Sequence, residues 1–201
     1  MALYSAFKND LNNEQRLMPL LDTYYKTYLN QYTFVRSTSS KEQFSGIDLI
    51  LTRKKSNAVF YVDEKAQLDY INEDLPTFAF ELSYIKHGLL KKGWFLDSYK
   101  KTHFYALVTG IYAENNEYTS CKITMVNRKK LLTKIHTLQL PQETLIDRRD
   151  RYAHGRTELP QLHPKNEGYL FFSKNNKAEQ PLNLILKLDW LIREGIAKRL
   201  V

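Results

Sequence analysis

The chain opens with apolar residues at helical spacing and continues with short apolar runs separated by polar turns. In residues 14–29 the apolar side chains recur every three or four positions, which predicts a helix with one buried face. Pro19 lies inside this pattern and must occupy the first turn or mark a kink, because proline lacks a backbone donor.

Two neighbouring apolar runs predict a β-hairpin. Residues 46–52 and 58–66 are rich in β-branched and aromatic side chains, and they flank the polar turn 54–57. Residues 77–84 fit a strand or a helix equally well, and residues 86–101 are expected to form a basic loop. Other runs predict further strands at residues 32–37, 103–112, 120–126 and 168–173.

The second half of the chain is expected to contain two helices, at residues 128–137 and 188–200, on either side of a less regular, arginine-rich stretch at 141–164. We find no internal repeat and no clear linker. The simplest interpretation is one domain over residues 1–201, of mixed α/β (α+β) class, with a central mixed sheet flanked by helices.

Composition narrows the class of protein. With 43% hydrophobic and 26% charged residues among 201, the chain is neither collagen-like nor wholly disordered. A net charge of +8 favours a polyanionic partner. The lone Cys121 excludes an internal disulfide and a cysteine-based zinc site, and its apolar surroundings predict a small core residue. The longest mostly apolar run, 103–112, is about half of a membrane-spanning helix, so we expect a cytoplasmic protein.

Acidic residues interrupt the apolar runs of the predicted hairpin. Asp48 lies among aliphatic residues in the first strand, and Asp63 and Glu64 lie near the end of the second. A carboxylate in apolar surroundings is costly unless a positive charge meets it, and a hard cation such as Mg2+ is one such charge. Strand alternation places Asp63, Lys65 and Gln67 on one face and Glu64 on the other.

The spacing of these residues resembles a known nuclease superfamily. Asp63-Glu64-Lys65 is the only acidic–any–lysine triplet in the chain, and it begins 15 residues after Asp48. This pattern resembles the PD-(D/E)xK superfamily of restriction-endonuclease-like nucleases over roughly residues 10–112. The resemblance implies a core with the order helix, β-hairpin, helix, strand in residues 10–112, and it makes residues 113–201 a C-terminal extension of the same domain.

Roles for individual residues follow from the same resemblance. Asp48 and Asp63 would be metal ligands, Lys65 the catalytic lysine, and Gln67 the polar residue that often follows it. A β-bulge would give the second ligand position to Glu64 instead of Asp63. The further acids Glu14 and Glu81 are candidates to approach the site, and Ile47 stands where the superfamily motif has proline.

Basic residues elsewhere are candidates for a nucleic-acid surface, because guanidinium and ammonium groups suit phosphate oxygens. A solvated basic face is the alternative interpretation, and Trp94, near two of these residues, fits a core aromatic as well as a stacking residue. The candidates are Lys91, Lys92, Arg128, Lys129, Arg148, Arg149 and Arg151.

Together these patterns predict a nuclease that hydrolyses DNA phosphodiester bonds and depends on Mg2+ or Mn2+. The first alternative is a catalytically inactive nucleic-acid-binding protein on the same fold. The second is a structural or partner-binding protein of phage or mobile-element type, in which the two strand acids and the lysine form a structural ion-pair cluster. The sequence leaves the oligomeric state open.

Overall fold

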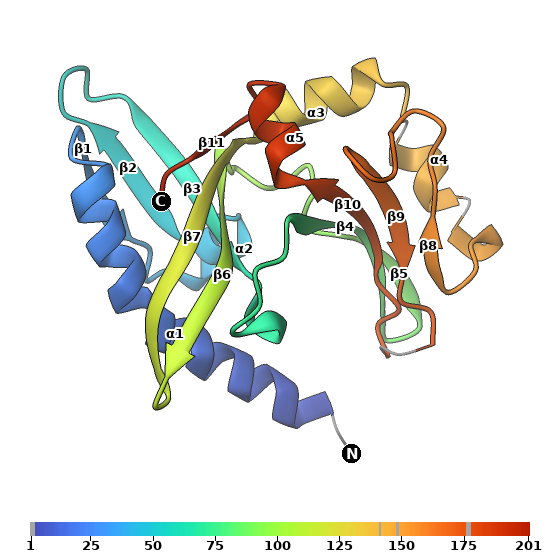
Figure 1. Cartoon of the computed structure of the whole chain (residues 1–201), viewed down its shortest axis with the longest axis horizontal. Helices are drawn as coiled ribbons and strands as arrows, with labels where there is room; N and C mark the ends of the chain where they lie inside the picture. Colours follow the sequence, from blue (N-terminus) through green and yellow to red (C-terminus); the bar gives the residue numbers. More distant parts are fainter. Residues whose placement is uncertain (1–2, 141, 148, 176–177) are drawn as a thin grey trace. The chain divides into compact units, whose positions relative to one another are not determined.

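In the computed structural model the chain divides into two compact units, each built from segments that are distant in the sequence. Unit 1 comprises Met1–Leu75, Lys101–Asn127 and Lys198–Val201, and unit 2 comprises Pro76–Lys100 and Arg128–Ala197. The structure describes residues 3–140, 142–147, 149–175 and 178–201, without the side chains of residues 3–11 and 142–144. Each unit contains a β-sheet and at least one helix (Figure 1), which confirms the mixed α/β class. The single-domain organisation stays a prediction.

Unit 1 is built on a mixed sheet in the order β1-β2-β3-β6-β7-β11. β3 and β6 run parallel, whereas the β1–β2, β2–β3 and β6–β7 pairs are antiparallel. The predicted hairpin is therefore present as β2–β3. The strands are β1 (Tyr32–Arg36), β2 (Leu49–Arg53), β3 (Val59–Ala66), β6 (Phe104–Glu114), β7 (Glu117–Asn127) and β11 (Ala197–Arg199).

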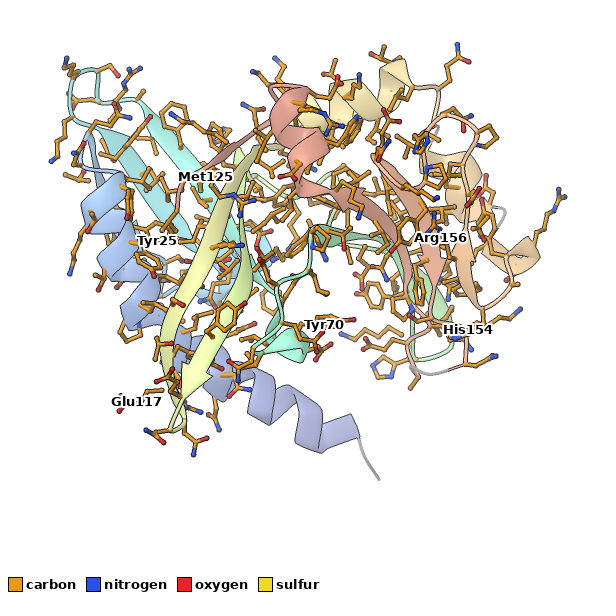
Figure 2. All side chains as sticks on the ribbon, viewed as in Figure 1. Tyr25, Tyr70, Glu117, Met125, His154 and Arg156 are labelled. Atoms are coloured by element: carbon orange, nitrogen blue, oxygen red, sulfur yellow. The ribbon has the colours of Figure 1, made fainter. Side chains whose placement is uncertain are left out.

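One long helix, α1 (Leu3–Tyr28), packs against the unit 1 sheet and contributes side chains to its core. Leu17, Leu21 and Tyr25 recur at helical spacing and are buried in one cluster with Leu49 and Val62 of the sheet. Figure 2 labels Tyr25 where the helix meets the strands. Each such side chain contributes about 1.5–3 kcal/mol when it is fully buried. No helix among the described residues has the length and apolar character needed to cross a membrane.

Two short helical segments complete unit 1. α2 (Ser40–Phe44) connects β1 to β2, and the 3-10 helix η1 (Leu68–Tyr70) follows β3. Cys121 is 5% exposed within the same core, which confirms the expected packing role. Burial raises the pKa of its thiol to about 12, so it is not a nucleophile at neutral pH.

Unit 2 contains a second sheet, antiparallel throughout, in the order β5-β4-β10-β9-β8. Phe80 of β4 lies opposite Leu184 of β10, and both are fully buried. The ring of Trp94 lies 5.6 Å from that of Phe80, in favour of the core interpretation of this tryptophan. The strands are β4 (Thr77–Lys86), β5 (Leu89–Lys92), β8 (Gly155–Thr157), β9 (Gly168–Phe172) and β10 (Leu182–Lys187). The helices are α3 (Arg128–Thr137), α4 (Gln142–Asp147), the 3-10 helix η2 (Arg149–Arg151) and α5 (Leu188–Arg193).

Several elements differ from the sequence prediction. The ambiguous residues 77–84 are strand, and the predicted basic loop contains β5. The helix predicted over 188–200 ends at Arg193 and gives way to β11. Gly195 explains this end, because its φ of 64° lies in the left-handed region that glycine adopts without strain and that terminates helices.

The helix expected between the hairpin and the next strand is missing. Residues 67–103, which are all described, contain only η1 and the strands β4 and β5. Residues 76–100 belong to unit 2, so the connection from β3 to the parallel strand β6 runs through the other sheet. A parallel pair needs a long crossover, and this chain makes it with strands of a second unit instead of a helix.

Candidate active site

Asp48 is fixed at the point where the β2–β3 ladder ends. It directly precedes β2, and its backbone N–H donates to the carbonyl oxygen of Val62 at 2.9 Å. Its carboxylate Oδ2 accepts the backbone N–H of Glu64 at 2.8 Å, which continues the ladder with a side-chain oxygen. The carboxyl group is thereby held against β3 and beside residue 63.

Asp63 and Lys65 lie two residues apart on the same face of β3. Lys65 Nζ donates to Asp63 Oδ1 and, at 3.3 Å, to the carbonyl oxygen of Glu64. Asp63 is 2% exposed, and its second oxygen, Oδ2, is buried and accepts no hydrogen bond. The Lys65 side chain is 27% exposed. A buried carboxylate oxygen without a partner is costly, and either a proton on the neighbouring Asp48 carboxyl group or a bound cation would offset that cost.

The electrostatics of Asp48 show that the two acids interact. Burial, and next the negative charge of Asp63, raise the pKa of the Asp48 carboxyl to about 7, although the charge of Lys65 and the Glu64 N–H act in the opposite direction. The second negative charge is therefore tolerated only as far as Lys65 and the Glu64 N–H offset it.

Lys65 is held in its charged form by this environment. Burial lowers the pKa of its ammonium group, but the carboxylates of Asp63 and Asp48 outweigh burial, and the net shift is upward. The negative charge of Glu14 on α1 also raises the pKa of Lys65, by a smaller amount. This predicted extra acid therefore interacts electrostatically with Lys65. Gln67 directly follows β3 and is half-buried, but its ψ of 66° is not that of a strand, so strand alternation no longer fixes the face of its side chain.

Glu64 lies on the opposite face of β3, where it accepts hydrogen bonds from a different set of residues. Arg36 Nη1 donates to Glu64 Oε2 at 2.6 Å, and the Tyr25 hydroxyl donates to Glu64 Oε1 at 2.7 Å. Arg36 also pairs with Asp22 of α1 at 2.7 Å. The register between β3 and β6 runs from Val62 to Ala66 without a shift, so no bulge turns Glu64 toward Asp48. The structure therefore brings Asp63, and not Glu64, together with Asp48 and Lys65.

The basic candidates all belong to unit 2, apart from Arg148, which lies outside the described residues. Lys91, Lys92, Lys129 and Arg151 are exposed, whereas Arg128 is half-buried and donates to the carbonyl oxygen of Asp97 at 3.0 Å.

Arg149 does not lie on a phosphate-accessible surface. It is 3% exposed, donates to the hydroxyl of Ser83 and to the carbonyl oxygen of Gln180, and stacks 4.5 Å from the ring centre of Phe172. Glu81 also belongs to unit 2. The pKa of Tyr84 in the same unit is raised mainly by burial and next by the negative charge of Glu81. These two residues therefore have roles inside unit 2.

Comparison with protein-family models, with curated proteins and with solved structures finds no match.

Proposed function

We propose that this protein is a metal-dependent nuclease that hydrolyses DNA phosphodiester bonds at the Asp48–Asp63–Lys65 cluster. The observation that carries the proposal is the pairing of two carboxyl groups beside one amine at the end of the β2–β3 hairpin, with Asp63 Oδ2 buried and without a donor. A structural ion pair needs one acid for one lysine. The second acid, Asp48, caps the ladder through the Glu64 N–H, but its pKa is raised to about 7 by burial and by Asp63, so its charge is not needed for that ion pair.

The donor set fits a hard divalent cation. Among the described residues no three His, Cys, Asp or Glu side chains form a metal-binding group, so Asp48 and Asp63 would be the protein ligands. Mg2+ is commonly held by one or two carboxylates, with waters and substrate phosphate oxygens completing its octahedron. When bound, Mg2+ or Mn2+ would polarise the scissile phosphate and lower the pKa of its bound water.

Residues of the chain would hold the ion and stabilise the charge on the phosphate. Asp48 and Asp63 would hold the ion, and Asp48 loses its proton near pH 7. Lys65 is charged and partly exposed, so it can donate a hydrogen bond to a phosphate oxygen and offset the negative charge that develops there. Its present partner, Asp63 Oδ1, keeps the ammonium group in place before substrate binds.

The order of elements supports a restriction-endonuclease-like core in part. A helix precedes the hairpin, and the next strand of unit 1, β6, runs parallel to β3. The missing second helix and Ile47 are departures from the superfamily pattern. A cytoplasmic location, expected because the longest apolar run is too short to span a membrane, belongs to the same proposal.

The test is a cleavage assay with circular DNA. Supercoiled double-stranded and single-stranded circles are incubated with the protein in Mg2+, in Mn2+ and in EDTA, and we expect nicked or linear products only with metal. Salt-sensitive binding without cleavage would favour the inactive nucleic-acid-binding protein, because phosphate neutralisation alone gives salt dependence. Neither binding nor cleavage would favour a structural protein in which Lys65 and Asp63 form only an ion pair.

A further inference from the structure

An aromatic pair lies on the same strand face as the proposed catalytic residues. Tyr61 precedes Asp63 by two positions on β3, so the two side chains share a face. The rings of Tyr61 and His103 are stacked, with centres 5.2 Å apart and an interplanar angle of 16°. His103 is exposed and Tyr61 is half-buried, and the ring of Phe60 lies 6.2 Å from that of His103 at an interplanar angle of 82°.

Backbone hydrogen bonds hold the histidine ring in position. His103 Nδ1 accepts the backbone N–H of Tyr61 at 2.9 Å, and the backbone N–H of His103 donates to the carbonyl oxygen of Tyr61 at 2.9 Å. The preceding residue, Thr102, is anchored by a 2.8 Å bond from its hydroxyl to the carbonyl oxygen of Gly46. Because Nδ1 is the acceptor, the neutral ring carries its proton on Nε2 and presents a donor to solvent.

The Tyr61–His103 pair lies at one end of a row of side chains that runs across strands β1, β2 and β3, next to the acidic residues. Val35, Ile50 and Tyr61 lie opposite one another on β1, β2 and β3, and Val35 is 65% exposed. The row lies two residues, or about 6.6 Å, along β3 from Asp63. That offset brings it within reach of the nucleotide next to a phosphate bound at Asp63.

Positive charge continues from the same row toward the hairpin turn. Lys55 is exposed there, and Lys101 is exposed two residues before His103. A strand of nucleic acid that leaves the acidic cluster along this face would meet stacking rings first and cations next. Aromatic faces beside cations are the combination by which proteins hold unpaired bases and their phosphates.

We propose that the Tyr61–His103 pair is a stacking platform for an unpaired base next to the scissile phosphate, which makes single-stranded or locally opened nucleic acid the substrate class. This inference rests on the proposed nuclease function. A base in a closed duplex presents no free face to the platform, so duplex substrates would have to open before they bind here.

Two substitutions at His103 separate stacking from hydrogen bonding. His103→Asn removes the ring and keeps an acceptor for the Tyr61 N–H, whereas His103→Phe keeps the ring and removes the acceptor. Tyr112→Ala, at an exposed position on strand β6, which begins directly after His103, is the matched control. Affinity for a fluorescent single-stranded oligonucleotide and for its duplex is measured by anisotropy with Ca2+ in place of Mg2+. We expect His103→Asn to weaken single-strand binding roughly tenfold, and His103→Phe and Tyr112→Ala to change it less than about twofold.

The outcomes distinguish the platform from the nuclease. Unchanged single-strand affinity in His103→Asn, or no single-strand binding by the wild type, overturns the platform. If the wild type still cleaves circular DNA in Mg2+, the nuclease proposal survives that result. Loss of single-strand binding in His103→Asn without cleavage by any variant supports the platform on an inactive protein.

Discussion

Replacing Lys65 with alanine is expected to slow metal-dependent DNA cleavage roughly a thousandfold while leaving DNA affinity within about twofold. Lys65 is the only amine that contacts Asp63 among the described ion pairs, and its ammonium group is kept charged by both neighbouring acids. Its loss removes a donor to the phosphate in the transition state, whereas many other cations contribute to binding. The measurement is the rate of nicking of circular DNA in Mg2+.

A matched lysine in the same unit provides the control. Lys122 pairs with Asp74 and both side chains are largely exposed, so Lys122→Ala should leave the cleavage rate unchanged. Lys65→Arg keeps the positive charge beside Asp63 but replaces the compact ammonium group, and we expect it to fold normally and to cleave slowly. Equal cleavage by wild type and Lys65→Ala would remove Lys65 from the catalytic machinery.

Asp48→Asn is expected to stabilise the metal-free protein while it abolishes cleavage. The pKa of Asp48 is raised to about 7, first by burial and next by the charge of Asp63, so the folded state disfavours the ionised form. An asparagine at this position keeps a side-chain oxygen for the Glu64 N–H and carries no charge. The charge of Lys65 is already included in this pKa, so at about 1.4 kcal/mol per pKa unit we expect a gain of up to about 4 kcal/mol at pH 8.

The gain in stability from Asp48→Asn depends on pH, because the folded and unfolded states bind different numbers of protons at Asp48. In the unfolded chain Asp48 titrates near its ordinary value of about 4, so between about pH 4 and 7 the folded state binds more protons. Wild-type stability therefore falls with rising pH across this window, and the advantage of Asp48→Asn grows from near zero below pH 4 to its full size above pH 7. Urea unfolding at several pH values measures the difference. Asp74→Asn, at an exposed acid of the same unit, is the control, and a pH-independent difference for Asp48→Asn would contradict this account.

The position of the cluster could be predicted from the sequence because it depends on local rules. Strand alternation places Asp63 and Lys65 on one face and Glu64 on the other, and a hairpin brings the start of one strand beside the end of the next. The contacts of Glu64 could not be predicted in this way. They come from Arg36 on β1 and Tyr25 on α1, and the helical pattern marks Tyr25 only as a core residue.

Strands that form only because they pair with distant segments could not be predicted from the sequence either. The short strands β5 and β11 carry mixed or polar sequences, and only their neighbours in the sheets define them as strands. The crossover from β3 to β6 passes through unit 2, which no local pattern marks as a boundary. Arg149 likewise reads as part of a basic surface, but Ser83 and Phe172 enclose it within unit 2.

Isothermal titration of Mn2+ into the wild type, Asp63→Asn and Glu64→Gln tests most directly whether Asp48 and Asp63 share a divalent cation beside Lys65. We expect one binding site in the wild type, the same site in Glu64→Gln, and at least about tenfold weaker binding in Asp63→Asn, because Asp63 supplies the buried oxygen that lacks a donor. Absence of Mn2+ binding by the wild type, or equal binding by the wild type and Asp63→Asn, would contradict the shared metal site.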